Sequence, residues 1–248
     1  MSDLKQQQTG FGATSGRPAT AGVCVSVYGN TISDLETKII LARKYKPSFI
    51  ELRLDYLDDP RVEDIARISR KFIGNEILTF RSANEGGVTR VSEQKRKEII
   101  SQFVSSSSPP YVDVEIATLE SSPGILEEVK SAGSRLIASS HNFRSIETPN
   151  RLKNLVRTAS RLKPLFAIKV VRKAKGFDDN RVILSLYSLV NEIAPTKLIA
   201  FCAGPFGVLS RVSCVQNGSP FTYVSLPNEK TAQGQLEVGS MQSLFANW

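Results

Sequence analysis

Residues 135–171 read RLIASSHNFRSIETPNRLKNLVRTASRLKPLFAIKVV, and this stretch indicates the architecture of the whole chain. Two apolar and β-branched runs, 135–140 and 166–171, flank a segment of helical period at 149–162, which begins at Thr148-Pro149. A strand, a helix and a second strand in this order predict two parallel strands joined by a crossover helix.

The same alternation repeats along the chain from Gly22 onward. Strands are predicted at residues 23–28, 49–56, 76–81, 111–117, 135–140, 166–171, 197–203 and 221–225. Helices are predicted at residues 32–45, 62–72, 92–105, 124–132, 149–162, 180–193, 206–215 and 238–245. Eight strand–helix units within about 225 residues match an α/β fold of the (β/α)8 TIM-barrel type.

The alternative architecture is an open, doubly wound sheet, but no Gly-x-Gly-x-x-Gly sequence follows the first predicted strand. The sequence therefore predicts a single-domain catalytic barrel over residues 22–248. Residues 1–21 are rich in Gln, Gly, Ser, Thr and Ala and lack periodicity, which predicts a flexible tail.

Composition narrows the function classes. The chain has 248 residues and a formal net charge of +8, with basic and acidic residues interleaved, so it suits either nucleic acid or a small anionic substrate. One histidine and three widely spaced cysteines argue against a transition-metal site and a disulfide framework, and fit a reducing cytosol. No apolar run approaches the roughly 20 residues of a membrane span. We therefore expect a cytoplasmic protein with no metal, cofactor or membrane partner.

The active sites of such barrels lie at the C-terminal ends of the strands, where charged residues gather in this chain. In the second predicted strand Glu51, Arg53 and Asp55 share one face, which is charged where a barrel strand is usually apolar. In the fourth, Asp113 and Glu115 do the same. These residues predict either the floor of an active site or a structural ladder of ion pairs.

Lys169 and His141 are the two residues that point most directly to a reaction. Lys169 lies within an apolar strand, where burial disfavours the ammonium and leaves an amine that can form an imine (Schiff base) with a ketone. His141, the one histidine, follows a strand and can exchange a proton near neutral pH. The alternatives are a lysine that snorkels or pairs with a carboxylate, and a histidine that only bonds a strand end.

Three loops add polar groups to the same end of the barrel. Arg211 follows the seventh strand and can bind a carboxylate through two parallel hydrogen bonds. The run Asn84-Glu85-Gly86-Gly87 allows a tight turn beside a ligand. The segment from Thr231 to Gln235 suits a polar, polyhydroxylated ligand.

Taken in order, these motifs resemble those of type I 3-dehydroquinate dehydratases. The motifs are Glu51-x-Arg53-x-Asp55, Arg81-Ser82-Ala83-x-Glu85-Gly86-Gly87, Asp113-x-Glu115, Ser140-His141-x-Phe143, Lys169, Gly207-x-x-Ser210-Arg211 and Ala232-x-Gly234-Gln235. The resemblance runs from about Val23 to the C-terminus. It implies a homodimeric barrel of the shikimate pathway that makes 3-dehydroshikimate from 3-dehydroquinate through a lysine imine, without metal.

The resemblance also implies roles for single residues. Lys169 would form the imine and His141 would shuttle protons, while Glu85 would orient the imidazole and favour its protonated form. Arg211 would bind the substrate carboxylate. Residues that would contact ring oxygens or support the site are Ser26, Glu51, Arg53, Arg81, Thr231 and Gln235.

The sequence departs from the family pattern at two places near this site, and two other functions stay open. Phe201 and Ala203 stand where methionines are common, and Gln233 replaces a proline in the loop from Thr231 to Gln235. One alternative function is that of a class I aldolase, which uses a lysine imine to cleave a carbon–carbon bond. The other is a non-catalytic basic barrel that binds nucleic acid.

Overall fold

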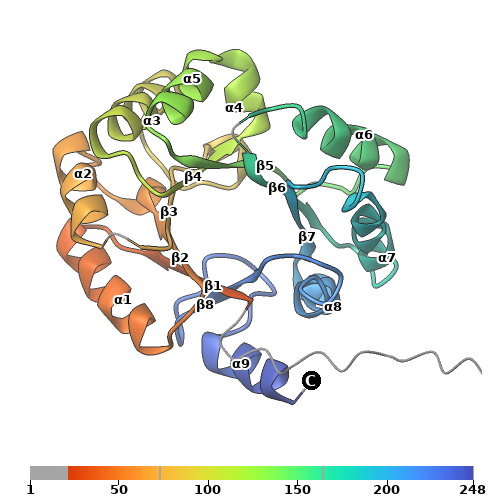
Figure 1. The fold of residues 1–248 in the computed structure, drawn as a ribbon. Coiled ribbons are helices and arrows are strands. Elements are labelled where there is room, and N and C mark those ends of the chain that lie inside the picture. Colours follow the sequence, from red (N-terminus) through yellow and green to blue (C-terminus); the bar gives the residue numbers. More distant parts are fainter. Residues whose placement is uncertain (1–21, 73, 164, 248) are drawn as a thin grey trace, which may run out of the picture.

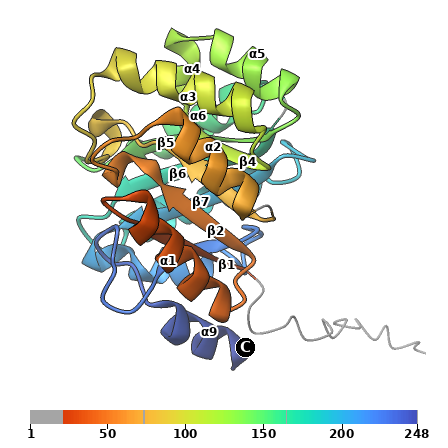
Figure 2. The ribbon, with the colours of Figure 1, turned by 90° about the vertical axis from the view of Figure 1, so that its left-hand side faces the viewer.

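The computed structural model describes residues 22–72, 74–163 and 165–247, and its eight parallel strands form a nearly closed barrel surrounded by helices (Figures 1 and 2). The hydrogen-bonded order is β7-β6-β5-β4-β3-β2-β1-β8. The strands are β1 (Val23–Tyr28), β2 (Phe49–Arg53), β3 (Glu76–Thr79), β4 (Tyr111–Glu115), β5 (Arg135–Asn142), β6 (Leu165–Lys173), β7 (Lys197–Ala203) and β8 (Thr222–Ser225). The predicted barrel is confirmed, and the tail predicted over residues 1–21 lies outside the described residues.

The helices cover the outside of the barrel, and their first residues follow the expected capping chemistry. Thr31 accepts a hydrogen bond from the backbone N–H of Asp34 at 3.2 Å, and Ser92 accepts one from Lys95 at 3.2 Å. In the described parts of the chain, none of these helices could cross a membrane. They are α1 (Ile32–Lys44), α2 (Val62–Lys71), α3 (Glu93–Ser107), α4 (Ile116–Ser121), α5 (Gly124–Ser131), α6 (Pro149–Ala159), α7 (Asp179–Leu184), α8 (Val208–Ser213) and α9 (Val238–Ala246).

The predicted strands 49–56 and 111–117 are too long at their C-terminal ends. A 3₁₀ turn, Leu54–Tyr56, follows β2, and α4, which the sequence did not predict, follows β4 at once. The residues after β2 still alternate in polarity, but the chain has already left the strand, and Asp55 binds the Arg53 guanidinium at 2.8 Å. The alternation of polar and apolar residues therefore continues in the sequence beyond the residue at which the strand ends.

Strand β7 lies at one end of the hydrogen-bonded order, and side-chain hydroxyls bond the edge that faces away from β6. The backbone N–H of Ala200 donates to the Tyr187 hydroxyl at 2.9 Å, and that of Cys202 donates to Ser210 Oγ at 2.9 Å. These contacts satisfy buried backbone donors that a strand-to-strand ladder would otherwise take up. They explain how the barrel tolerates an incomplete seam beside β7.

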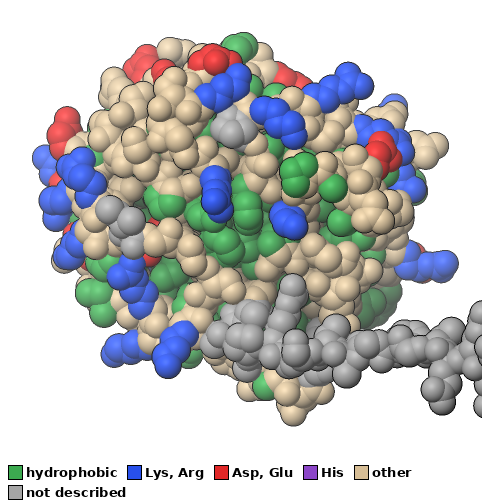
Figure 3. Space-filling view, in the orientation of Figure 1, with side chains coloured by type: hydrophobic (Ala, Val, Ile, Leu, Met, Phe, Trp, Pro, Cys, Tyr) green, Lys and Arg blue, Asp and Glu red, His purple; other side chains and the backbone are tan. Residues whose placement is uncertain are grey.

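Four aromatic rings close the N-terminal end of the barrel. Phe49 lies 4.7 Å from Phe221 and 5.1 Å from Tyr111, and Phe166 lies 5.0 Å from Tyr111, measured between ring centroids. Figure 3 views this end and shows hydrophobic side chains at its centre. The rings come from the N-terminal ends of β2, β4, β6 and β8, which fits the rule that alternate strands supply one layer of a barrel core.

The same four strands also supply a polar layer above this aromatic floor. Its members touch one another across the barrel, which shows that they point inward, and they are Glu51, Asp113, Lys169 and Tyr223. The floor thus places a charged layer in the barrel interior, directly beneath the C-terminal mouth.

Candidate active site

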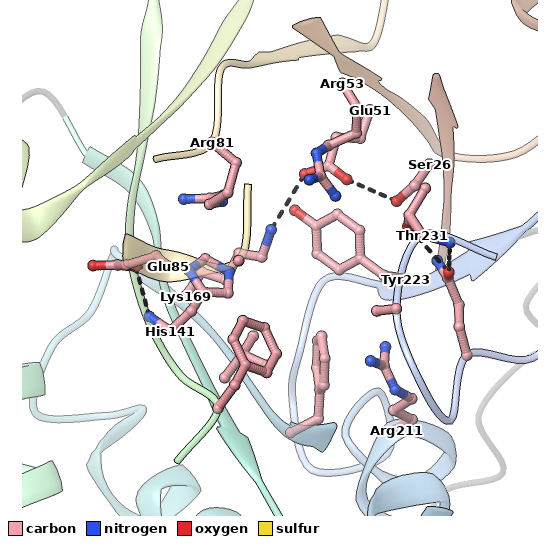
Figure 4. Close-up of a pocket in the computed structure, with 16 residues that line it drawn as sticks. Ser26, Glu51, Arg53, Arg81, Glu85, His141, Lys169, Arg211, Tyr223 and Thr231 are labelled. Carbon is pink, nitrogen blue, oxygen red and sulfur yellow. Dashed lines mark hydrogen bonds and ion pairs between the residues drawn. The ribbon is translucent and has the colours of Figure 1, made fainter. Parts of the chain in front are cut away.

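A pocket of about 490 Å³, part of it open to solvent, lies at the C-terminal ends of the strands (Figure 4). Its walls come from most strands of the barrel and from three of the loops that follow them. All ten residues that the sequence predicts for the site line it, namely Ser26, Glu51, Arg53, Arg81, Glu85, His141, Lys169, Arg211, Thr231 and Gln235. Residues far apart in sequence therefore meet around one cavity.

Lys169 lies at the bottom of this pocket and is 4% exposed. Its Nζ is 3.0 Å from Asp113 Oδ2 and 3.3 Å from Glu51 Oε1, and it stands 3.9 Å from the centre of the Tyr223 ring. The lysine does not snorkel to solvent, but it does pair with carboxylates. This pairing is compatible with a nucleophile, because it fixes the nitrogen at one point in the pocket.

The two carboxylates are themselves held by donors. Glu51 accepts hydrogen bonds from Ser26 Oγ at 2.7 Å and from Thr79 Oγ1 at 3.1 Å. Asp113 accepts one from Arg81 at 2.7 Å. Burial alone would raise the pKa of Asp113, but Arg81 and Lys169 outweigh it and lower the pKa to about 2. Asp113 is therefore a fixed negative charge next to the amine.

His141 is oriented by Glu85. One oxygen of Glu85, Oε2, lies 2.7 Å from the backbone N of His141 and 2.9 Å from its Nδ1 (Figure 4). Because this oxygen already accepts the backbone N–H, it acts as an acceptor for Nδ1–H as well. The proton of the neutral imidazole is then on Nδ1, and Nε2 keeps its lone pair as a base in the pocket.

The charge state of this pair differs from the sequence-based expectation. Burial lowers the pKa of His141 well below its usual value, and the nearby cations, Arg81 and Lys169 first among them, lower it further. Burial likewise raises the pKa of Glu85 to about 7, although Arg81 opposes this shift. These shifts favour the neutral imidazole, a base that can accept a proton, whereas the resemblance implies that Glu85 favours the protonated form.

Replacing Glu85 with Gln should make stability depend less on pH. The Glu85 carboxyl has a pKa of 4.5 when exposed and of about 7 in the folded protein. The contribution that this raised pKa makes to folding stability is therefore fully present below pH 4.5 and is lost as the pH rises through about 7. We therefore expect the difference in free energy of unfolding, Glu85→Gln minus wild type, to rise by about 1–3 kcal/mol from pH 4.5 to pH 7. Urea denaturation at each pH measures this difference. His141 is present in both proteins, so its titration cancels to first order. A difference that stays constant across this range would contradict the raised pKa.

Arg211 differs from the other arginines of the pocket. Arg53 holds Asp55 with two bonds of 2.8 Å, and Arg81 binds Asp113 and Glu115. Among the buried arginines that the structure describes, Arg211 alone has no carboxylate partner.

The surroundings of Arg211 leave its charge uncompensated. Its Nε is buried without a hydrogen-bond partner in the described parts of the chain, and its guanidinium stacks on Phe201 at 4.4 Å. Burial lowers the pKa of Arg211 to about 10. An anionic ligand would supply the missing partner.

The segment from Thr231 to Gln235 covers one side of the pocket and is tied to itself and to the loop after β7. Gln235 Oε1 accepts hydrogen bonds from the backbone N–H of Thr231 at 2.9 Å and from its hydroxyl at 3.1 Å. Gly234 has φ +75°, and a Cβ there would lie 2.2 Å from the carbonyl oxygen of Gly204. Glycine is therefore required where this segment rests on the loop after β7.

Three contributors to the site are not among the ten predicted site residues. The sequence places Asp113 in a charged face, but only the register of β4, β5 and β6 reveals that it meets Lys169. Tyr223 resembles an ordinary core residue of a strand, and Phe143 an ordinary loop residue. Phe143 stacks against the His141 ring, with centroids 6.2 Å apart, and packs closely on Gly86.

No metal-binding cluster of three or more His, Cys, Asp or Glu side chains occurs in the described residues. What the site offers is a buried lysine, an imidazole whose pKa is lowered, and a buried arginine without a carboxylate partner among the described residues. These groups suit imine chemistry on a carbonyl compound that carries a carboxylate.

Comparison with known proteins places this chain in a family. A family profile described as "Type I 3-dehydroquinase" matches residues 23–247. A 3-dehydroquinate dehydratase of Pyrococcus abyssi is 36% identical over 196 residues, which cover 79% of this chain and 85% of that one. Another of the same name, from Dehalococcoides mccartyi, is 32% identical over 201 residues, which cover 80% and 85%.

Solved structures agree in fold. The structure of 3-dehydroquinate dehydratase from Enterococcus faecalis superimposes with a TM-score of 0.80, and the match covers 94% of this chain and 95% of that chain. The two sequences are 20% identical, so this similarity concerns the barrel alone.

Proposed function

The chain belongs to the type I 3-dehydroquinase family of hydro-lyases, and we propose that it dehydrates 3-dehydroquinate to 3-dehydroshikimate through an imine on Lys169, with His141 transferring the protons. The observation that carries this proposal is the position of Lys169, a buried lysine fixed by Asp113 and Glu51 in the same pocket as the imidazole of His141.

Arg211 binds the carboxylate of the substrate. Its guanidinium is the buried cation in the described residues that lacks an anionic partner, so a carboxylate can bind without displacing one that is already there. A guanidinium fixes a carboxylate in orientation as well as in position, because two parallel hydrogen bonds define a plane. The ring is thereby held with its ketone toward Lys169.

Formation of the imine begins when the ammonium of Lys169 gives up a proton to His141 and becomes the nucleophilic amine. The nitrogen attacks the ketone carbon, and the carbonyl oxygen takes up protons and leaves as water while the nitrogen lone pair forms the C=N bond. His141 ends this stage neutral, since the protons it accepts are passed to the departing water. The iminium then acts as an electron sink, so that a proton on the adjacent carbon becomes acidic.

Elimination follows with the same imidazole in both roles. Nε2 of His141 takes the proton next to the iminium carbon, and the electrons form a neutral enamine. The enamine expels the ring hydroxyl, which leaves as water with the proton that His141 has just accepted. Positioned proton transfer of this kind contributes roughly 10²–10⁴-fold to the rate. Hydrolysis of the product imine frees Lys169.

The two alternative functions have less support. A class I aldolase would use the same imine to break a carbon–carbon bond, but the chain matches a dehydratase family over almost its whole described length. A nucleic-acid-binding barrel gives no reason for a charged layer of Glu51, Asp113 and Lys169 beneath the mouth.

Borohydride trapping tests the proposal. Treatment with borohydride in the presence of 3-dehydroquinate should reduce the imine, raise the protein mass by one ligand and stop turnover. Peptide mapping should place the adduct on Lys169. Turnover to 3-dehydroshikimate without any adduct would contradict the imine, and an adduct on another peptide would contradict the assignment to Lys169.

Arg211→Ala should raise KM by roughly 10- to 100-fold with a smaller loss in kcat, because the contact with the carboxylate is made in both the ground state and the transition state. The melting temperature should not fall in the way expected for a broken ion pair, since Arg211 forms none with a described residue. Steady-state kinetics and a thermal melt measure both effects. An unchanged KM would assign the carboxylate to Arg53 or Arg81 instead.

A further inference from the structure

Tyr223 is a buried tyrosine in the site whose hydroxyl has no partner among the residues that the structure describes. The residue lies in β8 and is 3% exposed, and its ring lines the pocket. Its hydroxyl oxygen is buried and makes no hydrogen bond with any described residue. A buried hydroxyl without a partner is costly, and in a functional site it indicates a group that obtains its partner from the ligand.

The position of this hydroxyl is next to the reacting nitrogen. Nζ of Lys169 is 3.9 Å from the centre of the Tyr223 ring. Figure 4 shows the hydroxyl directed toward the end of Lys169, on the side where Glu51 lies. The carboxylate oxygens nearby are already supplied with donors, since Glu51 accepts from Ser26 and Thr79.

The phenol is a donor and not a base. Burial raises the pKa of Tyr223 well above its usual value, and Glu51, Cys24 and Asp113 raise it further. It therefore keeps its proton throughout the working pH range. The ring face next to Nζ also favours a cation there, whether this is the ammonium or the iminium that replaces it.

We propose that Tyr223 is a further catalytic residue, whose hydroxyl donates a hydrogen bond to the oxygen on the carbon that Lys169 attacks; this role rests on the imine mechanism proposed above. That oxygen is bonded to the same carbon as Nζ, so it comes to lie beside Lys169. As the amine adds, electrons of the C=O bond move onto the oxygen, and the phenol stabilises the growing negative charge. His141 then supplies the proton with which the oxygen leaves as water, while Tyr223 keeps its own.

Tyr223→Phe isolates the hydroxyl, because the ring and its contact with Lys169 stay. In single-turnover experiments with 3-dehydroquinate, quenched with borohydride at increasing times, the rate of adduct formation should fall roughly 10- to 100-fold, as for the loss of one hydrogen bond to a charged group. The adduct should still form in full, at the same peptide, and KM should change little. The melting temperature should stay the same or rise, because the hydroxyl removed has no partner among the described residues.

Tyr187→Phe is the matched control. Tyr187 is also a buried tyrosine, but its hydroxyl bonds the backbone N–H and C=O of Ala200 outside the site. This variant should lower the melting temperature by about 2–4 °C and should trap substrate at the wild-type rate. The two variants should thus show opposite patterns of rate and stability.

The outcomes separate the two proposals. Wild-type protein that forms no adduct would overturn the imine mechanism itself. Wild-type protein that traps substrate, together with Tyr223→Phe that traps it at the same rate, would overturn the role of the hydroxyl and leave the imine intact. That role would also be overturned if kcat of Tyr223→Phe fell while adduct formation kept its rate, since the hydroxyl would then act later. Slower trapping with a melting temperature that does not fall supports the proposal.

Discussion

Lys169→Ala should abolish turnover and the borohydride-trapped adduct together. Without the amine there is no electron sink for the proton that must be removed, and losses of a covalent nucleophile are on the order of 10⁵-fold or more. Removing the ammonium also leaves Asp113 and Glu51 facing each other without their shared cation. A thermal melt is therefore needed to show that the inactive variant is folded.

Lys173→Ala provides the matched control for this variant. Lys173 ends the same strand but is only partly buried, and it does not line the pocket. It should keep both turnover and the adduct. If Lys169→Ala still gave an adduct of the expected mass, the nucleophile would be another lysine and the mechanism would have to be rebuilt around it.

His141→Ala should lower kcat by about 10³–10⁴-fold while leaving an adduct that borohydride can trap. Imine formation needs the amine first and the imidazole only as a helper that relays protons, whereas elimination needs the imidazole twice. In this variant Glu85 can still accept the hydrogen bond from the backbone N–H of residue 141, which is 2.7 Å long in the wild type. The end of β5 and the loop that carries Glu85 should therefore stay in place. The two inactive variants should therefore look alike in a rate assay and differ by mass.

Asn142→Ala controls for damage to the end of β5. The Asn142 side chain accepts hydrogen bonds from the backbone of Arg144 and Ser145 and does not line the pocket of Lys169. Near-wild-type turnover in Asn142→Ala is expected. Near-wild-type turnover in His141→Ala would instead assign the proton transfers to a carboxylate, with Glu85 the first to test.

The barrel could be predicted because each strand–helix unit carries its own local signals. β1 and β7 begin and end at the predicted residues, and Thr31 caps α1 as its position suggests. The errors arise where contacts of charged side chains override the pattern. The fold-back of Asp55 onto Arg53 ends β2 early, and α4 begins directly after Glu115, which the Arg96 side chain binds at 3.1 Å.

The pocket residues could be predicted more fully than their charge states. Strand-end position and residue type suffice to bring Lys169, His141 and Arg211 to one place. Whether the imidazole is protonated depends on burial and on cations from several strands, which no local motif encodes. The roles in catalysis, the homodimer and the cytoplasmic location stay predictions.

The aromatic floor closes the N-terminal end of the barrel, so the interior opens at the C-terminal end. Because Phe49, Tyr111, Phe166 and Phe221 fill the opposite end, a ligand reaches Lys169 through the C-terminal mouth, whose lining includes Arg211 and the segment from Thr231 to Gln235. Substrate and product thus share one passage, so the product must leave the pocket before the next substrate molecule can enter. Product that accumulates should accordingly compete with substrate for the pocket. A ligand bound at the mouth would prevent both substrate entry and product release.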